Sequence, residues 1–195
     1  GTLWMLKPFV HIRFGQLWSH RIGNFALEPE LSLCERDADP SSSKYVDLWH
    51  HFDAEGDLLR TPYKRSEAIS NQQLDVMWQR VIHISDFARP LYKLNRMWPG
   101  SNDDFTIKRP RHHDTRGLLG RFPAHLAFSQ PEIERGLASL EELGIPGNAK
   151  FICFHARDSE YLKRANIAPH GDWQWQDLRD SCIQNYVPAA EKLAE

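Results

Sequence analysis

The sequence predicts an α/β fold in which a mainly parallel sheet is covered by helices. Short apolar runs rich in β-branched and aromatic residues, the pattern of buried strands, alternate with stretches whose apolar residues recur at helical spacing. Parallel strands need a crossover connection, usually a helix, so this alternation favours a parallel sheet. The composition, with 41% hydrophobic and 26% charged residues in a chain of 195, is typical of a folded globular protein.

The first fifty residues are expected to hold two strands with a helix between them. Residues 8–14 (PFVHIRF) form a β-rich apolar run that Gly15 closes, and residues 44–52 (KYVDLWHHF) form a second run. Between the two runs, the apolar positions of residues 25–34 keep helical spacing despite Pro29, a residue that is unfavourable inside a helix. The order strand, helix, strand is that of one parallel βαβ unit.

Two further helices are expected in the middle of the chain. Ser70 is a suitable N-cap for an amphipathic helix whose apolar positions continue to Ile84. Pro90 suits the first turn of another helix, because its missing N–H would be unpaired there in any case. On this second helix Leu91 and Leu94 share one side, which we expect to face the core.

The remaining elements are a loop, two helices and a strand. Residues 101–122 are polar and are expected to form an irregular surface loop. A capping-box spacing predicts a helix over residues 129–144. Residues 150–156 (KFICFHA) have the strongest strand pattern in the sequence, and residues 181–195 indicate a helix that Pro188 either kinks or restarts.

Composition excludes several classes of protein. The net charge is -2 and the Lys and Arg residues are scattered, so the chain has no basic patch for binding nucleic acid. The three cysteines show no CxxC spacing, and we therefore expect neither a disulfide framework nor a zinc site. No run reaches the roughly 18 apolar residues of a membrane span and no signal peptide is apparent, so a cytoplasmic location is expected.

Two strand-to-helix junctions are the candidate binding sites. In an open α/β sheet, ligands bind outside the carboxyl ends of the strands, where helix N-termini present free N–H groups to anions. Residues 19–24 and residues 155–159 occupy such junctions, and each contains an arginine, Arg21 or Arg157. A guanidinium can grip a phosphate or carboxylate with two parallel hydrogen bonds. The alternative is an arginine paired with a neighbouring carboxylate such as Asp158.

The histidines indicate no metal site. Neighbouring side chains on a strand point to opposite faces, so the adjacent pairs at 50–51 and 112–113 cannot each supply two ligands to one ion. His155 shares a face with Arg157 because the two lie two residues apart, although it can equally be a core histidine satisfied by a carbonyl. The glycines complete neither GxGxxG nor GxxxxGK[ST], which removes the main support for a dehydrogenase or a kinase.

Three segments resemble a family of bacterial glycosyltransferases. The segments are FICFHARDSEYLKR, DWQWQDLRDSCIQNYVPAAEKLAE and RIGNFALEPEL, and they are similar to the family's HxRDSxYL, YRDxxIxxY and RIGHxxxxPE motifs. The resemblance runs from about residue 21 to residue 195. Asn24 stands where the family usually has His, and Leu178 stands where it usually has Tyr.

The resemblance implies a GT-B architecture, distantly like that of fucosyltransferases, with two facing Rossmann-like domains and a nucleotide-sugar donor. It implies an acceptor-side domain at residues 1–147 and the start of a donor-binding domain at residues 148–195, with no required metal and no cofactor. Arg157 and His155 would be the catalytic residues. The residues expected to bind the donor and its diphosphate are Arg157, Asp158, Ser159, Tyr161, Arg179 and Asp180. Those expected in the N-terminal loop facing the cleft are Arg21, Gly23 and Asn24.

The expected function is transfer of a sugar from a nucleotide-sugar donor to a glycan or a lipid-linked acceptor, in the synthesis of cell-surface glycans. Peripheral association with a membrane is compatible with such an acceptor. Because such enzymes continue well beyond a chain of this length, we expect a fragment with little activity of its own. The alternatives are a non-catalytic carbohydrate- or phosphate-binding module and a phosphate-ester hydrolase, which would need a nucleophile beside the HxR pair. The base that would deprotonate the acceptor is left open.

Overall fold

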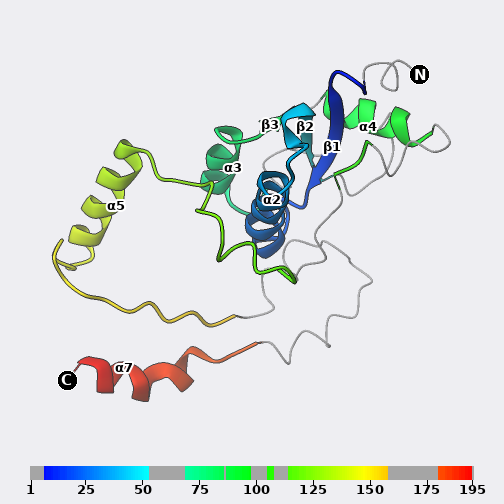
Figure 1. Cartoon of the computed structure of the whole chain (residues 1–195). Coiled ribbons are helices and arrows are strands. Elements are labelled where there is room, and N and C mark those ends of the chain that lie inside the picture. Colours follow the sequence, from blue (N-terminus) through cyan, green and yellow to red (C-terminus); the bar gives the residue numbers. More distant parts are fainter. Residues whose placement is uncertain are drawn as a thin grey trace. The chain divides into compact units, whose positions relative to one another are not determined.

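Three parallel strands form the centre of the computed structural model, which describes residues 7–52, 69–85, 87–97, 105–107, 114–157 and 180–194. β1 (His11–Leu17) pairs with β2 (Tyr45–His51), and β2 pairs with β3 (His83–Ile84), in the order β1-β2-β3 (Figure 1). The register of the first pair runs from His11 opposite Tyr45 to Leu17 opposite His51. The predicted Rossmann-like α/β fold with a parallel sheet is confirmed.

A short segment around Thr106 extends the sheet beyond β1. The amide of Phe14 donates to the carbonyl of Phe105 at 2.8 Å, and the amide of Ile107 donates to the carbonyl of Phe14 at 2.8 Å, which forms a parallel bridge. Both polar groups of Phe14 point to one side, so this segment lies across β1 from β2. The prediction of a surface loop over residues 101–122 is therefore wrong at 105–107. Phe105 and Ile107 are both buried and alternate with Thr106, as in a strand.

Helices cover both faces of the sheet (Figure 1). α2 (Ile22–Asp37) and α3 (Gln72–Gln79) pack on one face, and α4 (Ala88–Arg96) packs on the other. The core under α2 and α3 consists of the buried side chains Leu17, Phe25, Leu33, Trp49, Ile69, Trp78, Ile82 and Ile107. The core under α4 is smaller and contains Phe14, Ala88 and Phe105, with Ile12, Leu48 and Tyr92 packed against it. A three-layer arrangement results.

Pro29 lies inside α2, and the structure compensates for the hydrogen bond that it cannot make. Residue 29 would normally donate its amide to the carbonyl of Phe25, but proline has no N–H. Trp78 supplies the missing donor, because its indole Nε1–H donates to the Phe25 carbonyl at 2.9 Å in the buried core. The helix expected at residues 25–34 is thus confirmed through the proline, and it extends beyond the expected range at both ends, from Ile22 to Asp37.

Gly15 lies inside the first strand and does not end it. The strand expected at residues 8–14 is displaced to His11–Leu17. Gly15 sits opposite Trp49 in the register, and a Cβ added to it would lie 2.5 Å from Cε3 of that indole. Glycine is needed here because the Trp49 ring occupies the space above it, which is a common reason for glycine inside a strand.

Two helix predictions need correction. α3 ends at Gln79, not Ile84, and its N-cap is Asn71, whose side chain accepts from the amide of Leu74 at 2.8 Å. Ile84 belongs to β3, because the apolar residues after the helix continue as a short extended run. α4 forms as expected around Pro90, but Leu91 and Leu94 are about half exposed while Ala88 and Tyr92 pack on the sheet.

Residues 130–195 form a second unit of the chain, and residues 1–129 form the first. In the second unit α5 (Gln130–Glu142) is the predicted helix, and it is followed by Gly144 at a φ of 78°. A 3-10 helix η3 (Ile183–Tyr186) leads into α7 (Val187–Ala194), so Pro188 lies in the first turn of a restarted helix. The expected domain boundary at residue 147 stays a prediction.

The strand expected at residues 150–156 is absent from the structure. Residues 151–157 form neither helix nor strand, and the side chains of Phe151 and Ile152 are 53% and 62% exposed. An apolar run becomes a strand only when a neighbouring strand accepts and donates its backbone hydrogen bonds. No described residue of the second unit makes a backbone hydrogen bond with residues 151–156.

The helices of the described ranges include none that is both long enough and apolar enough to cross a membrane.

Candidate functional site

The carboxyl edge of the sheet in the first unit gathers polar side chains from the loops after β1 and β2. Ser19 and His20 follow β1 and are buried, at 0% and 6% exposed, and Arg21 is half-buried at the start of α2. The carbonyl of Ser19 accepts the amide of Ser70 at 2.8 Å, which ties the loop after β1 to the segment before α3. β2 delivers His51 to the same edge. Because the Thr106 segment returns on the far side of β1, this edge is also the topological switch point where such sheets bind ligands.

His51 and Asp75 form a closely packed pair at this edge. Nε2 of His51 lies 2.6 Å from Oδ1 of Asp75, and the two side chains are only 9% and 5% exposed. Asn71 caps α3 so that Asp75 falls in the first turn, and Gln79 donates to the other carboxylate oxygen at 2.6 Å. The carboxylate is therefore held in place from its own helix and in turn fixes the orientation of the imidazole.

The Asp75 contact leaves one nitrogen of His51 open. An ionised carboxylate accepts from Nε2–H, and a neutral ring then carries its lone pair on Nδ1. Within the described ranges Nδ1 of His51 has no hydrogen-bond partner. A neutral imidazole that is oriented by a carboxylate and has one nitrogen open is the arrangement of a general base.

An aromatic wall, formed by side chains that directly follow β1 and β2, lies at the same edge of the sheet. The ring of His20 lies 4.2 Å from that of Phe52, and Trp18 packs against both rings with centroid distances of 5.3 and 4.9 Å. Aromatic rings of this kind can also stack on the apolar face of a sugar ring, although His20 itself is only 6% exposed. His50 points to the opposite face, where its ring lies 5.2 Å from Tyr92 of α4, as the alternation along a strand requires.

The predicted N-terminal loop residues lie at the same edge. Arg21 is the N-cap residue of α2, and its extended backbone (φ -126°, ψ 111°) leads directly into the helix without a side-chain cap. Gly23 is exposed, with no heavy atom within 4 Å of the position that a Cβ would take. Asn24 instead turns along the helix and donates to Oε1 of Glu28 at 2.9 Å. Gly23 therefore borders open space at the helix start, Arg21 is half-buried beside it, and Asn24 is turned away along the helix.

In the second unit the structure brings together two of the predicted donor-site residues. Nε of Arg157 lies 3.6 Å from Oδ1 of Asp180, and the Arg157 carbonyl accepts the amide of Ser181 at 2.9 Å. His155 is exposed, and no contact with Arg157 is found. Four further residues expected at this site lie outside the described ranges, namely Asp158, Ser159, Tyr161 and Arg179.

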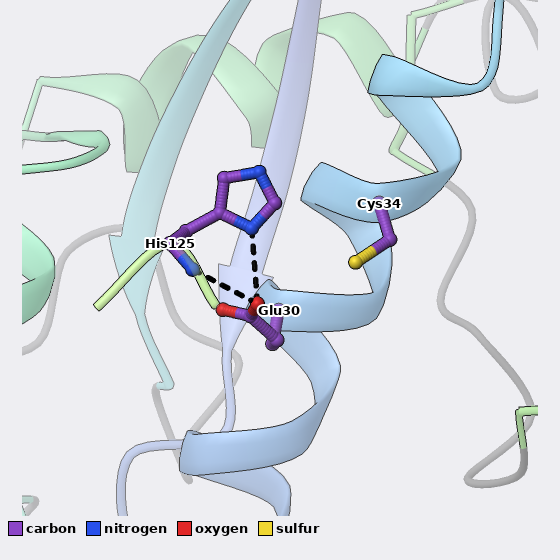
Figure 2. Close-up of side chains that lie close together, drawn as sticks. All are labelled: Glu30, Cys34 and His125. Atoms are coloured by element: carbon purple, nitrogen blue, oxygen red, sulfur yellow. Dashed lines mark hydrogen bonds and ion pairs between the residues drawn. The ribbon is translucent and has the colours of Figure 1, made fainter. Parts of the chain in front are cut away.

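The described residues also contain one group with the chemistry of a metal site. Glu30 and Cys34 project from α2, and His125 comes from the irregular segment before α5; the ligand atoms of all three lie within 4.8 Å of one another (Figure 2). The spacing of the cysteines gave no sign of this group. Its members come from distant segments, since 95 positions separate Glu30 from His125.

No family model, curated protein or solved structure matches the chain in the three comparisons made.

Sequence reasoning also missed the His51–Asp75 pair. The two residues are 24 positions apart, and no motif links them. One weak signal was present, since His51 ends a predicted strand and Asp75 falls in the first turn of a predicted helix, positions that meet at the carboxyl edge of a parallel sheet.

Proposed function

We propose that the chain is part of a glycosyltransferase that transfers a sugar from a nucleotide-sugar donor to a hydroxyl of its acceptor, with His51 as the base. The observation that carries the proposal is the His51–Asp75 pair, at 2.6 Å, at the carboxyl edge of a Rossmann-like sheet. If the first unit is the acceptor-side domain of a GT-B enzyme, it would supply this base, and among its described residues His51 is oriented by a carboxylate at one nitrogen only.

The proposed step balances without a further reactant. The acceptor hydroxyl oxygen forms a bond to the anomeric carbon, its proton passes to Nδ1 of His51, and the bond to the nucleoside diphosphate breaks with the electron pair leaving on the phosphate oxygen. Asp75 stabilises the imidazolium that forms. Attack by an external hydroxyl in one step inverts the configuration of the sugar. The aromatic wall of His20, Phe52 and Trp18 would hold a sugar ring beside the base.

Charge on the departing diphosphate must be stabilised, and without a metal the task falls to arginine and to helix N-terminal amides. In this proposal Arg157 binds the diphosphate, with Asp180 orienting its guanidinium through the 3.6 Å contact. Asp158, Ser159, Tyr161 and Arg179 keep the donor-binding roles that the resemblance implies. Arg21 and Gly23, at the start of α2, likewise keep the cleft-facing role that the resemblance implies. The proposed setting is the cytoplasm, with a glycan or lipid-linked acceptor.

The test uses the product of the natural gene beside the 195-residue chain. Both proteins are screened with nucleotide diphosphate sugars for a rise in melting temperature, and donors that bind are then assayed for transfer to glycan and lipid-linked acceptors. We expect transfer by the gene product if it is longer than 195 residues, and little or none by the chain alone. His51→Gln should lower turnover about 100- to 10,000-fold, the range for a general base, without lowering the melting temperature.

His83→Gln is the matched control, because His83 is an exposed histidine at the start of β3 in the same sheet. It should leave turnover unchanged. Failure of every donor to bind or react with the gene product would reject the proposal. Binding without transfer, unaffected by His51→Gln, would identify instead the carbohydrate- or phosphate-binding module that the sequence also allows.

A further inference from the structure

A second cluster of reactive side chains lies on α2, away from the carboxyl edge of the sheet. Glu30 and Cys34 are four residues apart and therefore share one side of the helix, and both project toward the ring of His125 (Figure 2). Cys34 is fully buried, while the side chains of Glu30 and His125 are each 15% exposed. A glutamate oxygen, a thiol and an imidazole nitrogen thus meet within 4.8 Å in a largely dry environment.

The ring of His125 has a carboxylate at each of its nitrogens. Nδ1 lies 3.0 Å from Oε1 of Glu30, and Nε2 lies 2.9 Å from Oδ2 of Asp37. The backbone amide of His125 also donates to Oε1 of Glu30, at 3.1 Å. A neutral imidazole has only one N–H, so one of these two ring contacts would place a lone pair against a carboxylate oxygen. A cation at one of these contacts, either a second ring proton or a metal ion, would remove this repulsion.

We propose that Glu30, Cys34 and His125 bind a divalent transition-metal ion, with Zn²⁺ the best fit. Thiolate, imidazole and carboxylate are the three ligand types found in protein zinc sites. His125 would bind through Nδ1, while its Nε2–H donates to Asp37, and a carboxylate on the far nitrogen is the usual outer partner of a metal-bound histidine.

The distances are compatible with this coordination. Ligands of a tetrahedral zinc ion lie about 3.5 Å apart, since each bond is about 2.0 to 2.3 Å long. The ligand atoms now lie within 4.8 Å of one another. Small side-chain rotations would shorten these separations to about 3.5 Å, because Glu30 and Cys34 already lie side by side on one helix. Three protein ligands leave a fourth position for water.

The electrostatics of the cluster favour a cation over an additional neutral group. Burial, and then the negative charges of Glu30, Asp37 and Asp114, raise the pKa of the Cys34 thiol. Burial opposes protonation of His125, but the hydrogen bonds to Glu30 and Asp37 outweigh it and raise the pKa of the ring. Burial is the largest cause of the Cys34 shift, but the carboxylates around the cluster raise the pKa of both groups, and a divalent cation would offset their negative charge while holding the thiol as thiolate.

The role of such an ion would be structural. It would fasten the irregular segment that contains His125 to α2, and this segment has no helix or strand of its own between residues 114 and 129. The inference does not depend on the proposed transfer reaction, because Glu30 lies nine residues beyond Arg21, roughly 13 Å along the helix at 1.5 Å per residue.

The test is a titration of the untagged, metal-stripped and reduced protein with Co²⁺, followed by displacement with Zn²⁺. We expect one Co²⁺ per chain and a thiolate-to-cobalt charge-transfer band, which Zn²⁺ removes as it replaces cobalt. Cys34→Ser should abolish the band. Asp37→Asn, which removes only the outer partner, should weaken Zn²⁺ binding about 10- to 100-fold with the band retained.

The double variant Cys153→Ser/Cys182→Ser is the matched control, because both of those cysteines are exposed and lie in the other unit. It should bind cobalt like the wild type. Circular dichroism of each variant shows whether it is folded. His125→Gln also removes a proposed ligand, and it should disturb folding less than Cys34→Ser because His125 lies in an irregular segment. A wild-type protein without the band would overturn the proposal, as would a band that survives Cys34→Ser or disappears in the double control.

Discussion

Two histidines of the first unit have carboxylate partners, and the number of partners decides what each can do. Asp75 holds one nitrogen of His51 and leaves the other open, so the ring can accept a proton from a bound hydroxyl. Glu30 and Asp37 occupy both nitrogens of His125, so neither nitrogen of that ring is left to accept a proton from a substrate. The same residue types thus produce a candidate base at the sheet edge and a candidate metal ligand on the helix.

Arg157 gives a prediction at the residue scale. Replacement with lysine keeps the charge but loses the two-pronged geometry that suits a diphosphate. In the natural gene product we expect Arg157→Lys to cost about 2 to 4 kcal/mol of transition-state stabilisation, or roughly 30- to 1000-fold in turnover. The exposed Arg135 of α5 is the control, and Arg135→Lys should leave turnover unchanged.

Turnover and melting temperature are measured on the same samples of both variants. If Arg157→Lys loses activity only in step with its melting temperature, the contact with Asp180 is structural and Arg157 does not bind the donor.

At the scale of elements, α2 depends on a side chain from α3. The Pro29 position leaves the carbonyl of Phe25 without its helical donor, and the indole of Trp78 replaces it across the core. Helix propensity alone would place a break at the proline. The helix continues because the partner that satisfies the orphaned carbonyl is 53 residues away in the sequence, a distance at which no local pattern can reveal it.

A double-mutant cycle tests this dependence. Trp78→Phe should lower the free energy of unfolding, in part by leaving a buried carbonyl unsatisfied, which costs about 1 to 3 kcal/mol. In a Pro29→Ala background the new amide can donate to Phe25, so the same Trp78→Phe change should cost less. Urea denaturation of the four proteins should give a coupling of about 0.5 to 3 kcal/mol, and additive effects would show that the indole bond is not the replacement donor.

At the scale of the whole molecule, sequence patterns predicted the first unit far better than the second. In the first unit the strand at 44–52 and the helices expected around residues 25–34 and from Ser70 onward are found, because their apolar residues recur with a clear period, whereas in the second unit the helices are found but the strand is not. The buried strand-like segment at 105–107 was missed because three residues are too few to show the alternation of apolar and polar residues that marks a strand. The prediction of a strand at 150–156 was wrong although its apolar pattern is strong. A strand also needs a neighbouring strand, and the described structure has none beside this segment.

The candidate site could be predicted only in part. The position of Arg21 and Gly23 after β1 followed from the general rule that parallel sheets bind ligands at their carboxyl edge. The pairing of His51 with Asp75, and of His125 with Glu30, could not follow from it. Each pair depends on how a loop and a helix come together, which is a property of the tertiary structure and has no spacing rule in the sequence.

The second unit leads to a prediction about local stability. None of the residues described in it is buried, and the amides of residues 151–156 donate no hydrogen bond among the described residues. Native-state hydrogen exchange reports the free energy of opening for each amide, from about zero for unpaired groups up to the global value for a core. We therefore expect the amides of β1 and β2 to exchange slowly in the 195-residue chain, and those of residues 151–156 to exchange almost as fast as in an unfolded peptide.

The same measurement on the natural gene product tests the proposed donor domain. If a longer product supplies a strand that pairs with residues 150–156, their amides should become as slow as those of β1, because both their hydrogen bonds and their burial would then be supplied. The amides of β1 and β2 serve as the internal control, since their pairing lies within the first unit and should not change. Slow exchange at residues 151–156 in the 195-residue chain itself would contradict the exposed, unpaired segment, and unchanged fast exchange in a longer product would remove this segment from the donor domain.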